Sequence, residues 1–315
     1  MQYRDFGKTG LKVSEVGFGG WAIGGGEHGN SYGLTDDKTS LLAVQKAIDL
    51  GCNFFDTADV YGWGHGEELL GKALKGKREH LLIATKVGAD FYQGAGFQTF
   101  TAQYIRYALE KSLARLKTDY IDVYQLHNPP LRLINQESTY EIMKQLKQEG
   151  KVRAWGLSIF DPAEGLSALG VGHPDSLQVT YNLFNKRASE ALFPKAKAAG
   201  CAIIAREPLA SGFLTGKYAN GAKFDKSDFR SHWPASIVIS RAKAAEKLSF
   251  LALAQRTLAQ SAIKYALANH DVTVAIAGVK SVEQAVENFT SSEATELSAE
   301  ELLRIKDLQA HNFEL

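Results

Sequence analysis

The chain has few cysteines and no long apolar runs. Only two of its 315 residues are cysteines, Cys52 and Cys201. Two cysteines supply neither a disulfide framework nor the clustered thiols of a zinc site, so we expect both to be buried core residues. No apolar run approaches the roughly 20 residues of a membrane-spanning helix. The polar start, MQYRDFGKTG, lacks the apolar core of a signal peptide. We therefore expect a cytoplasmic protein.

Charge of one sign is also lacking. The chain carries 36 basic and 35 acidic residues, a net charge of +1, without a charged half or tail. This balance argues against a nucleic acid or an anionic membrane as the main partner. The sequence contains no linker and no low-complexity segment, and its length suits one α/β barrel. We predict one domain over residues 1–315, and the sequence leaves the oligomeric state open.

Eight apolar segments recur roughly every 30 residues, each bounded by loop or helix signals. They are 16–20, 53–58, 81–87, 120–127, 152–160, 177–184, 201–209 and 273–279. Their near-continuous apolar character is typical of strands that are buried on both faces. The clearest intervening helix runs over 101–117, with Thr101 as its N-cap. Gly51, Gly150 and Gly200 follow helices directly before strands, where glycine accepts the left-handed conformation that ends a helix.

These observations predict the fold class α/β, specifically a (β/α)₈ TIM barrel. Two additions to the repeat are expected. A short alternating segment over 3–16 with a glycine turn predicts an N-terminal β-hairpin. A polar, irregular segment over 217–248 predicts a long loop before the last units, lying over the active-site face.

Polar residues stand where the predicted strands end, which is where barrel enzymes place their chemistry. Lys86 and Asp56 each follow an apolar strand, and either charge alone would be costly to bury. We therefore expect the two to form a buried ion pair. His127 ends the fourth strand, and on its own it fits a core histidine as well as a functional one.

Several motifs together resemble the aldo-keto reductase family. They are FFDTADVYGWGHGEELLGKAL, the lysine after LLIAT, QLHNP and IAGVKSVEQAVENF, and the similarity spans nearly the whole chain. The resemblance implies a catalytic set of Asp56, Tyr61, Lys86 and His127. In this set Tyr61 donates the proton that a reduced carbonyl oxygen needs. Lys86 is expected to lower the pKa of that phenol, Asp56 to hold Lys86, and His127 to orient the substrate oxygen.

The resemblance also implies an NADP(H) site. Ser158 and Gln178 correspond to contacts with the nicotinamide amide, although Ile159 stands where the family usually has asparagine. Arg206 occupies a position that is commonly aromatic and stacks on the nicotinamide ring. The remaining implied contacts lie in two segments, PLASGFLTGK and GVKSVEQAVEN. They are Leu209, Ser211, Gly212, Lys217, Gly278, Lys280, Ser281, Gln284, Glu287 and Asn288.

Lys280 and Ser281 precede a helix, a position that favours a 2′-phosphate, so NADP(H) is expected over NAD(H). No metal is expected. One motif points elsewhere: residues 17–22, GFGGWA, formally fit a dinucleotide-binding fingerprint. No helix is predicted to follow it, and the fingerprint carries little weight without one. We interpret this segment as a loop in which Trp21 forms one wall of a substrate pocket, with Trp63 as a second wall.

Alternatives of other classes stay open. Some family members resemble channel-associated β subunits, which bind NADP(H) and act chiefly as partners. If this chain is such a subunit, it is expected to show little turnover. A metal-dependent barrel hydrolase or isomerase would need several converging His and carboxylate ligands, and only His127 lies at a clear strand end. The substrate is expected to be a small carbonyl compound or a sugar. The same site could instead oxidise a sugar at its anomeric carbon.

Overall fold

Eight parallel strands close into a barrel in the computed structural model, which describes residues 1–27, 31–92, 97–218 and 221–314. The barrel strands are β3 (Val16–Gly19), β4 (Phe54–Asp56), β5 (Leu82–Val87), β8 (Ile121–His127), β9 (Val152–Ser158), β10 (Ser176–Thr180), β11 (Ala202–Arg206) and β12 (Val274–Gly278). Each strand pairs with its sequence neighbours, and β12 pairs with β3 to close the ring. The predicted TIM barrel and all eight strand segments are confirmed.

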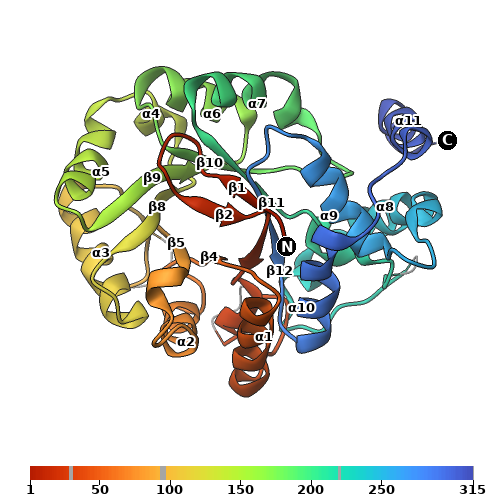
Figure 1. The fold of residues 1–315 in the computed structure, drawn as a ribbon, viewed down its shortest axis with the longest axis horizontal. Helices are drawn as coiled ribbons and strands as arrows, with labels where there is room; N and C mark the ends of the chain where they lie inside the picture. Colours follow the sequence, from red (N-terminus) through yellow and green to blue (C-terminus); the bar gives the residue numbers. More distant parts are fainter. Residues whose placement is uncertain (28–30, 93–96, 219–220, 315) are drawn as a thin grey trace.

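Helices surround the barrel in the view along its axis (Figure 1). The helices of the described residues are α1 (Asp37–Asp49), α2 (His65–Ala73), α3 (Ala102–Leu116), α4 (Leu131–Ile134), α5 (Ser138–Gln148), α6 (Pro162–Val171), α7 (Arg187–Ala199), α8 (Ala235–Lys247), α9 (Leu258–Ala268), α10 (Val282–Phe289) and α11 (Ala299–Ala310), and all but α8 and α11 belong to this ring. The predicted start of α3 is confirmed, because the Thr101 hydroxyl accepts a hydrogen bond from the Tyr104 amide at 3.3 Å. Gly51, Gly150 and Gly200 all have positive φ, as expected for residues that end helices.

The predicted N-terminal hairpin is also confirmed and consists of β1 (Tyr3–Asp5) and β2 (Lys12–Ser14). Figure 1 shows it lying across one end of the barrel. Phe6, Leu11 and Val13 of this hairpin share a buried cluster with Phe54 and Leu82, the first residues of their strands. The hairpin therefore closes the amino-terminal end of the barrel. The hairpin does not cover the carboxyl-terminal end, where the predicted site residues lie.

Four strands end two to four residues earlier than the sequence predicts, and one predicted loop is partly helical. The sixth strand was expected to reach residue 184 but ends at Thr180, because the Asn182 side chain accepts hydrogen bonds from the Phe184 and Asn185 amides and forms a turn. The expectation of an irregular loop over 217–248 is wrong for its second half, which is helix α8. Val238, Ala242 and Ala245 lie on one buried face of α8, and the first two pack with Phe213.

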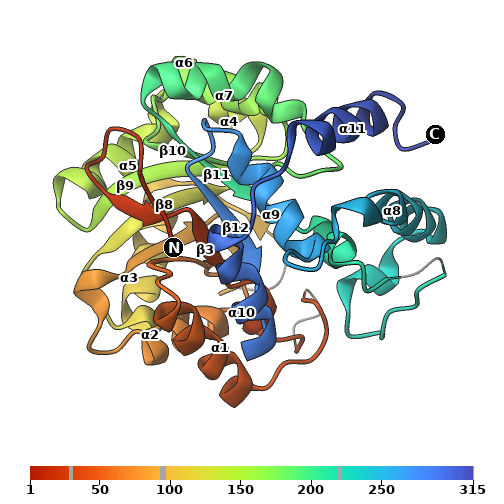
Figure 2. The same cartoon turned by 45° about the vertical axis from the view of Figure 1, so that its right-hand side comes forward.

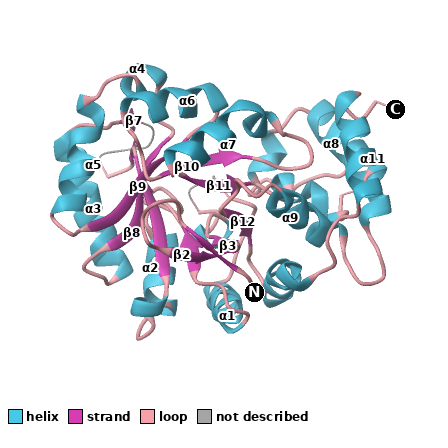
Figure 3. Cartoon of the chain, turned by 45° about the horizontal axis from the view of Figure 1, so that its top comes forward, coloured by secondary structure: helices cyan, strands magenta, loops and turns pink. Residues whose placement is uncertain are grey.

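Helices α8 and α11 stand outside the ring of barrel helices (Figures 2 and 3). Cys52 and Cys201 are buried free thiols, as predicted. None of the described helices is long and apolar enough to cross a membrane. Within the described ranges, no group of three or more His, Cys, Asp or Glu side chains is arranged to hold a metal ion.

Candidate functional site

Four side chains from three successive barrel units meet at the carboxyl-terminal end of the barrel. Asp56 ends β4, Tyr61 follows in the loop before α2, Lys86 lies near the end of β5, and His127 ends β8. The Lys86 ammonium donates to Asp56 Oδ1 at 2.6 Å and lies 3.2 Å from the Tyr61 hydroxyl. The Tyr61 and His127 rings meet edge to face with centroids 5.9 Å apart. The structure thus brings together all four residues that the sequence singled out.

Lys86 is completely buried, yet it keeps its charge. Its ammonium also donates to the Thr57 carbonyl at 2.8 Å, so all three of its donors have partners. Burial on its own would lower the pKa of Lys86. Asp56 and Tyr61 outweigh that effect and raise the pKa of Lys86 above its usual value. The expected buried ion pair with Asp56 is therefore present, and it holds a permanent positive charge beside the phenol.

The net direction for Tyr61 differs from the expectation. Lys86 does favour the phenolate, but burial of the phenol has the larger effect, so the pKa of Tyr61 is raised. The phenol therefore stays protonated at neutral pH. Burial lowers the pKa of His127 well below its usual value, and the charges of Lys86 and Arg206 lower it further. A neutral imidazole and a protonated phenol thus face the same space.

The three residues expected near the nicotinamide lie on adjacent strands: Ser158 and Arg206 end β9 and β11, and Gln178 is the central residue of β10. In the strand register Ser158 of β9 stands opposite Gln178 of β10, and Thr180 stands opposite Arg206 of β11. Ser158 contacts the Asn128 side chain at 3.4 Å. Gln178 donates to Asp56 Oδ2 at 2.7 Å. Arg206 donates to the Ile159 carbonyl at 3.1 Å, and its guanidinium lies over the Phe160 ring at 5.1 Å from the centroid.

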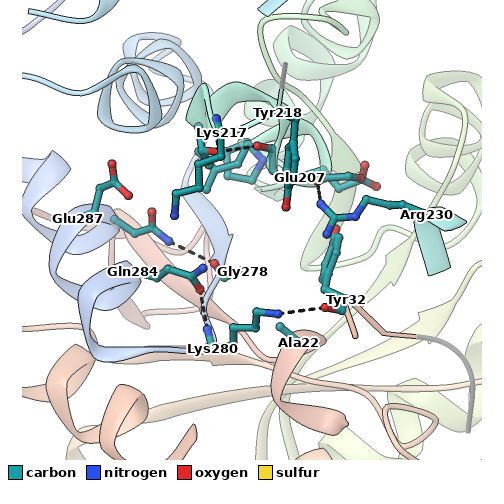
Figure 4. Close-up of a pocket in the computed structure, with 16 residues that line it drawn as sticks. Ala22, Tyr32, Glu207, Lys217, Tyr218, Arg230, Gly278, Lys280, Gln284 and Glu287 are labelled. Atoms are coloured by element: carbon teal, nitrogen blue, oxygen red, sulfur yellow. Dashed lines mark hydrogen bonds between the residues drawn. The ribbon is translucent and has the colours of Figure 1, made fainter. Parts of the chain in front are cut away.

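A cleft of about 740 Å³, including the open space at its mouth, runs beside this strand end. Nine of the predicted cofactor residues line it: Leu209, Ser211, Gly212, Lys217, Gly278, Lys280, Gln284, Glu287 and Asn288. Figure 4 shows Lys217 and Lys280 entering the cleft from opposite sides. Ser281 is not part of the wall. It caps α10, where its hydroxyl accepts from the Gln284 amide at 3.3 Å.

The wall of the cleft has the features of an anion site. Ser211 and Gly212 have positive φ in succession, so the backbone turns sharply there, and an added Cβ at Gly212 would lie 3.2 Å from Arg230. Lys280 donates to the Tyr32 carbonyl at 3.0 Å, and its backbone amide is held by Gln284 at 2.9 Å. Burial lowers the pKa of Lys280. Two lysines and a tight backbone turn suit the phosphates of a dinucleotide.

The two tryptophans proposed as pocket walls have different surroundings. The Trp21 ring packs against Tyr32 and Phe229 at 4.9 and 4.8 Å and lies 6.3 Å from the Tyr61 ring. Trp63 has positive φ and stacks with Phe91 at 6.1 Å. Trp21 therefore lies next to the proton-donor position. The segment GFGGWA leads into a three-residue 3₁₀ turn, and α1 begins only at Asp37, so no dinucleotide fingerprint helix follows. Residues 28–30 of this loop lie outside the described residues.

Three further residues were missed by the sequence analysis. Tyr32 and Arg230 line the cleft, and Arg230 bonds the Ser211 carbonyl at 2.7 Å while its guanidinium lies 4.9 Å from the Tyr32 ring. Their contacts join segments that are far apart in sequence, so no local pattern marked them. Gln125 bonds Asp56 in the barrel interior at 3.3 Å. A signal for it existed, because Gln125 and His127 are two residues apart and share one face of β8.

Comparisons with known proteins agree with this fold and identify the family. A sequence model described as the aldo/keto reductase family matches residues 15–310. Aldo-keto reductase YhdN from Bacillus subtilis (strain 168) is 39% identical over 236 residues, covering 74% of this chain and 70% of that protein. A probable voltage-gated potassium channel subunit beta from Oryza sativa subsp. japonica is 30% identical, covering 96% of this chain and 94% of its own. The solved holo form of aldo-keto reductase AKR11C1 from Bacillus halodurans superimposes with a TM-score of 0.81 at 32% identity, covering 98% of this chain and 96% of that one.

Proposed function

This chain belongs to the aldo/keto reductase family of oxidoreductases, and we propose that it transfers hydride between NADP(H) and a carbonyl or alcohol substrate with Tyr61 as general acid and base. One observation carries the proposal: a fully bonded Lys86 lies 3.2 Å from the Tyr61 hydroxyl, at the same barrel end as a lysine-lined cleft. The four catalytic roles and the cofactor contacts are assigned on this basis.

Reduction proceeds through groups that are already in position. NADPH, when bound, supplies the hydride. As negative charge develops on the carbonyl oxygen, Tyr61 donates its phenol proton to that oxygen, and the adjacent Lys86 ammonium stabilises the resulting tyrosinate. His127, neutral because of its lowered pKa, hydrogen-bonds the same oxygen and orients it. In the oxidative direction the ionised Tyr61 removes the proton from the alcohol.

The cofactor residues divide between the two ends of a dinucleotide. Ser158, Gln178 and Arg206 are assigned to the nicotinamide end because they lie on the adjacent strands β9 to β11, where Gln178 bonds Asp56 and the charge of Arg206 acts on His127. Lys217 and the turn at Ser211 and Gly212 are assigned to the pyrophosphate. Lys280 and the N-terminus of α10 are assigned to a 2′-phosphate, which favours NADP(H) over NAD(H). Gln284, Glu287 and Asn288 are assigned to the adenosine side.

The substrate is proposed to be a small aldehyde, ketone or sugar that packs against Trp21, with Trp63 at a second wall. Two relatives, a probable voltage-gated potassium channel subunit beta and an L-galactose dehydrogenase, define the two alternatives. One is a cofactor-binding partner with little turnover, and the other is an aldose dehydrogenase working in the oxidative direction. The complete set of four catalytic residues, joined by three contacts, supports turnover over a purely binding role.

The test is a screen of aldehydes, ketones and aldoses in both directions with each nicotinamide, followed through the absorbance of the reduced ring. We expect turnover that is faster with NADP(H) than with NAD(H). Tight NADPH binding without turnover of any compound would instead support the partner-subunit alternative. Turnover of aldoses alone, and only with the oxidised cofactor, would identify a dehydrogenase.

A further inference from the structure

The barrel interior changes character at its carboxyl-terminal end. Lower down it is apolar, with Phe54 of β4 and Val123 of β8 in one buried cluster. Two residues later the same strands present Asp56 and Gln125, and β10 presents Gln178. These strands are the second, fourth and sixth of the barrel, and alternate strands supply the side chains of one interior layer. The uppermost of these layers is therefore polar, and it forms the base of the catalytic site, to which its Asp56 belongs.

Three donors meet on the Asp56 carboxylate in this layer. Lys86 bonds Oδ1, whereas Gln178 Nε2 and Gln125 Nε2 donate to Oδ2 at 2.7 and 3.3 Å. Gln178 Nε2 also lies 3.4 Å from Gln125 Oε1, which links the two amides. Asp56 and Gln178 are each 2% exposed and Gln125 is fully buried. We refer to Gln125 and Gln178 together as the amide pair.

Neutral donors at this position have a specific consequence. A buried carboxylate needs several hydrogen bonds to remain charged. A second cation could provide them, but it would compete with Lys86 for Asp56 and weaken that ion pair. Amides stabilise the carboxylate without adding charge. They also prevent Asp56 from rotating, so that Oδ1 stays directed at Lys86.

We propose that the amide pair positions Asp56, and through it the Lys86 ammonium, against the Tyr61 hydroxyl, so that Gln125 and Gln178 tune the proton donor without touching the substrate oxygen. This inference rests on the proposed function of Tyr61. Two effects follow from loss of either amide. Asp56 becomes less shielded, and Lys86 loses its fixed orientation. Both disfavour the phenolate, so both move the titration of Tyr61 to higher pH.

The titration of Tyr61 is measured directly, without turnover, by fluorine NMR of the full-length protein carrying fluorotyrosine at position 61. Gln125→Met keeps the side-chain length but removes the amide that donates to Asp56. Gln178→Met removes the other amide of the pair, which forms the shorter hydrogen bond to Asp56. We expect the midpoint of the Tyr61 titration to rise by about one pH unit in Gln125→Met and by more in Gln178→Met. Gln125→Glu, which replaces the donor with an acceptor, is expected to shift the midpoint at least as far as Gln125→Met.

Kinetics and a packing control separate positioning from general stability. In Gln125→Met the pH profile of alcohol oxidation should move to higher pH, with a roughly tenfold lower rate at a fixed pH below the midpoint. The KM for the cofactor should stay within about twofold, because Gln125 does not line the cleft. Val123→Ala removes a buried side chain one layer below on the same strand and should lower the melting temperature without moving either midpoint.

A Tyr61 midpoint unchanged in the folded Gln125 and Gln178 variants would overturn the inference, as would an equal shift in Val123→Ala. Failure of the proposed function looks different. In that case the wild-type protein turns over no carbonyl compound or alcohol, while the fluorine titration still reports whether the amide pair acts on Tyr61.

Discussion

The proton-transfer network and the cofactor cleft lie side by side but are built in opposite ways. Asp56 and Lys86 are almost completely buried, come from adjacent strands and are held by short hydrogen bonds. Lys217 and Lys280 come from loops at the ends of β11 and β12 and point into an open cleft (Figure 4). The network is preorganised for one reaction, because its groups have their partners before any ligand arrives. In the cleft, the Lys280 ammonium bonds a neutral carbonyl, that of Tyr32, rather than a carboxylate, which suits a charged ligand that must enter and leave.

This comparison predicts that changes in the network affect the chemical step, whereas changes in the cleft affect binding. The largest effect is expected for Tyr61→Phe. Loss of the phenol proton donor should lower kcat by about 10² to 10⁴-fold. The dissociation constant for NADPH, measured by fluorescence quenching, should stay within about twofold. Full carbonyl reduction by this variant would show that another group supplies the proton.

Lys86→Met tests whether the network also supports folding. It leaves the Asp56 carboxylate buried without its cation, which should destabilise the protein by about 3–5 kcal/mol in denaturant unfolding. Activity should be lost as well. The double variant Asp56→Asn with Lys86→Met removes both charges and should recover most of the lost stability but none of the activity. Unchanged stability in the single variant would contradict the buried ion pair as the structure has it.

The pH dependence should distinguish the two directions of reaction. Because the pKa of Tyr61 is raised, the phenol is protonated at neutral pH. Carbonyl reduction should therefore be independent of pH around neutrality and fall only in alkaline solution, above that pKa. Alcohol oxidation requires the phenolate, so its rate should rise about tenfold per pH unit up to the same pKa. Profiles of kcat/KM against pH, measured in both directions, check that the two dependences are opposite. The pH dependence of cofactor affinity is measured as the control.

Lys280→Ala removes a lysine from the cleft, as Lys86→Met removes one from the network. Of the changes considered, it should have the smallest effect on activity. Loss of one charge-assisted contact should raise the dissociation constant for NADPH about tenfold and leave that for NADH nearly unchanged. The value of kcat at saturating NADPH should stay close to that of the wild type. An equal loss of affinity for both cofactors would remove the assignment of Lys280 to a 2′-phosphate.

The same contrast between the buried network and the open cleft explains which parts of each could be predicted from the sequence. The strands were predictable from their apolar runs. The Asp56–Lys86 pair was predictable because a single charged residue at the end of a buried strand needs a partner of opposite charge. Helix α8 was missed, since the polar segment that precedes it masked its apolar face. Tyr32 and Arg230 were also missed, because the contact between them joins residues nearly 200 positions apart, which no local pattern encodes.

The sequence by itself determined the barrel and its hairpin, because strand periodicity and helix-ending glycines act over short distances. The set of four residues at the carboxyl-terminal end of the barrel came from the resemblance of its motifs to the aldo-keto reductases. The tertiary structure alone decided the protonation of that site. Burial outweighs the effect of Lys86 on Tyr61, and two glutamines from distant strands complete the bonding of Asp56. The physical reason is that desolvation depends on everything packed around a group, and a linear sequence does not specify those neighbours.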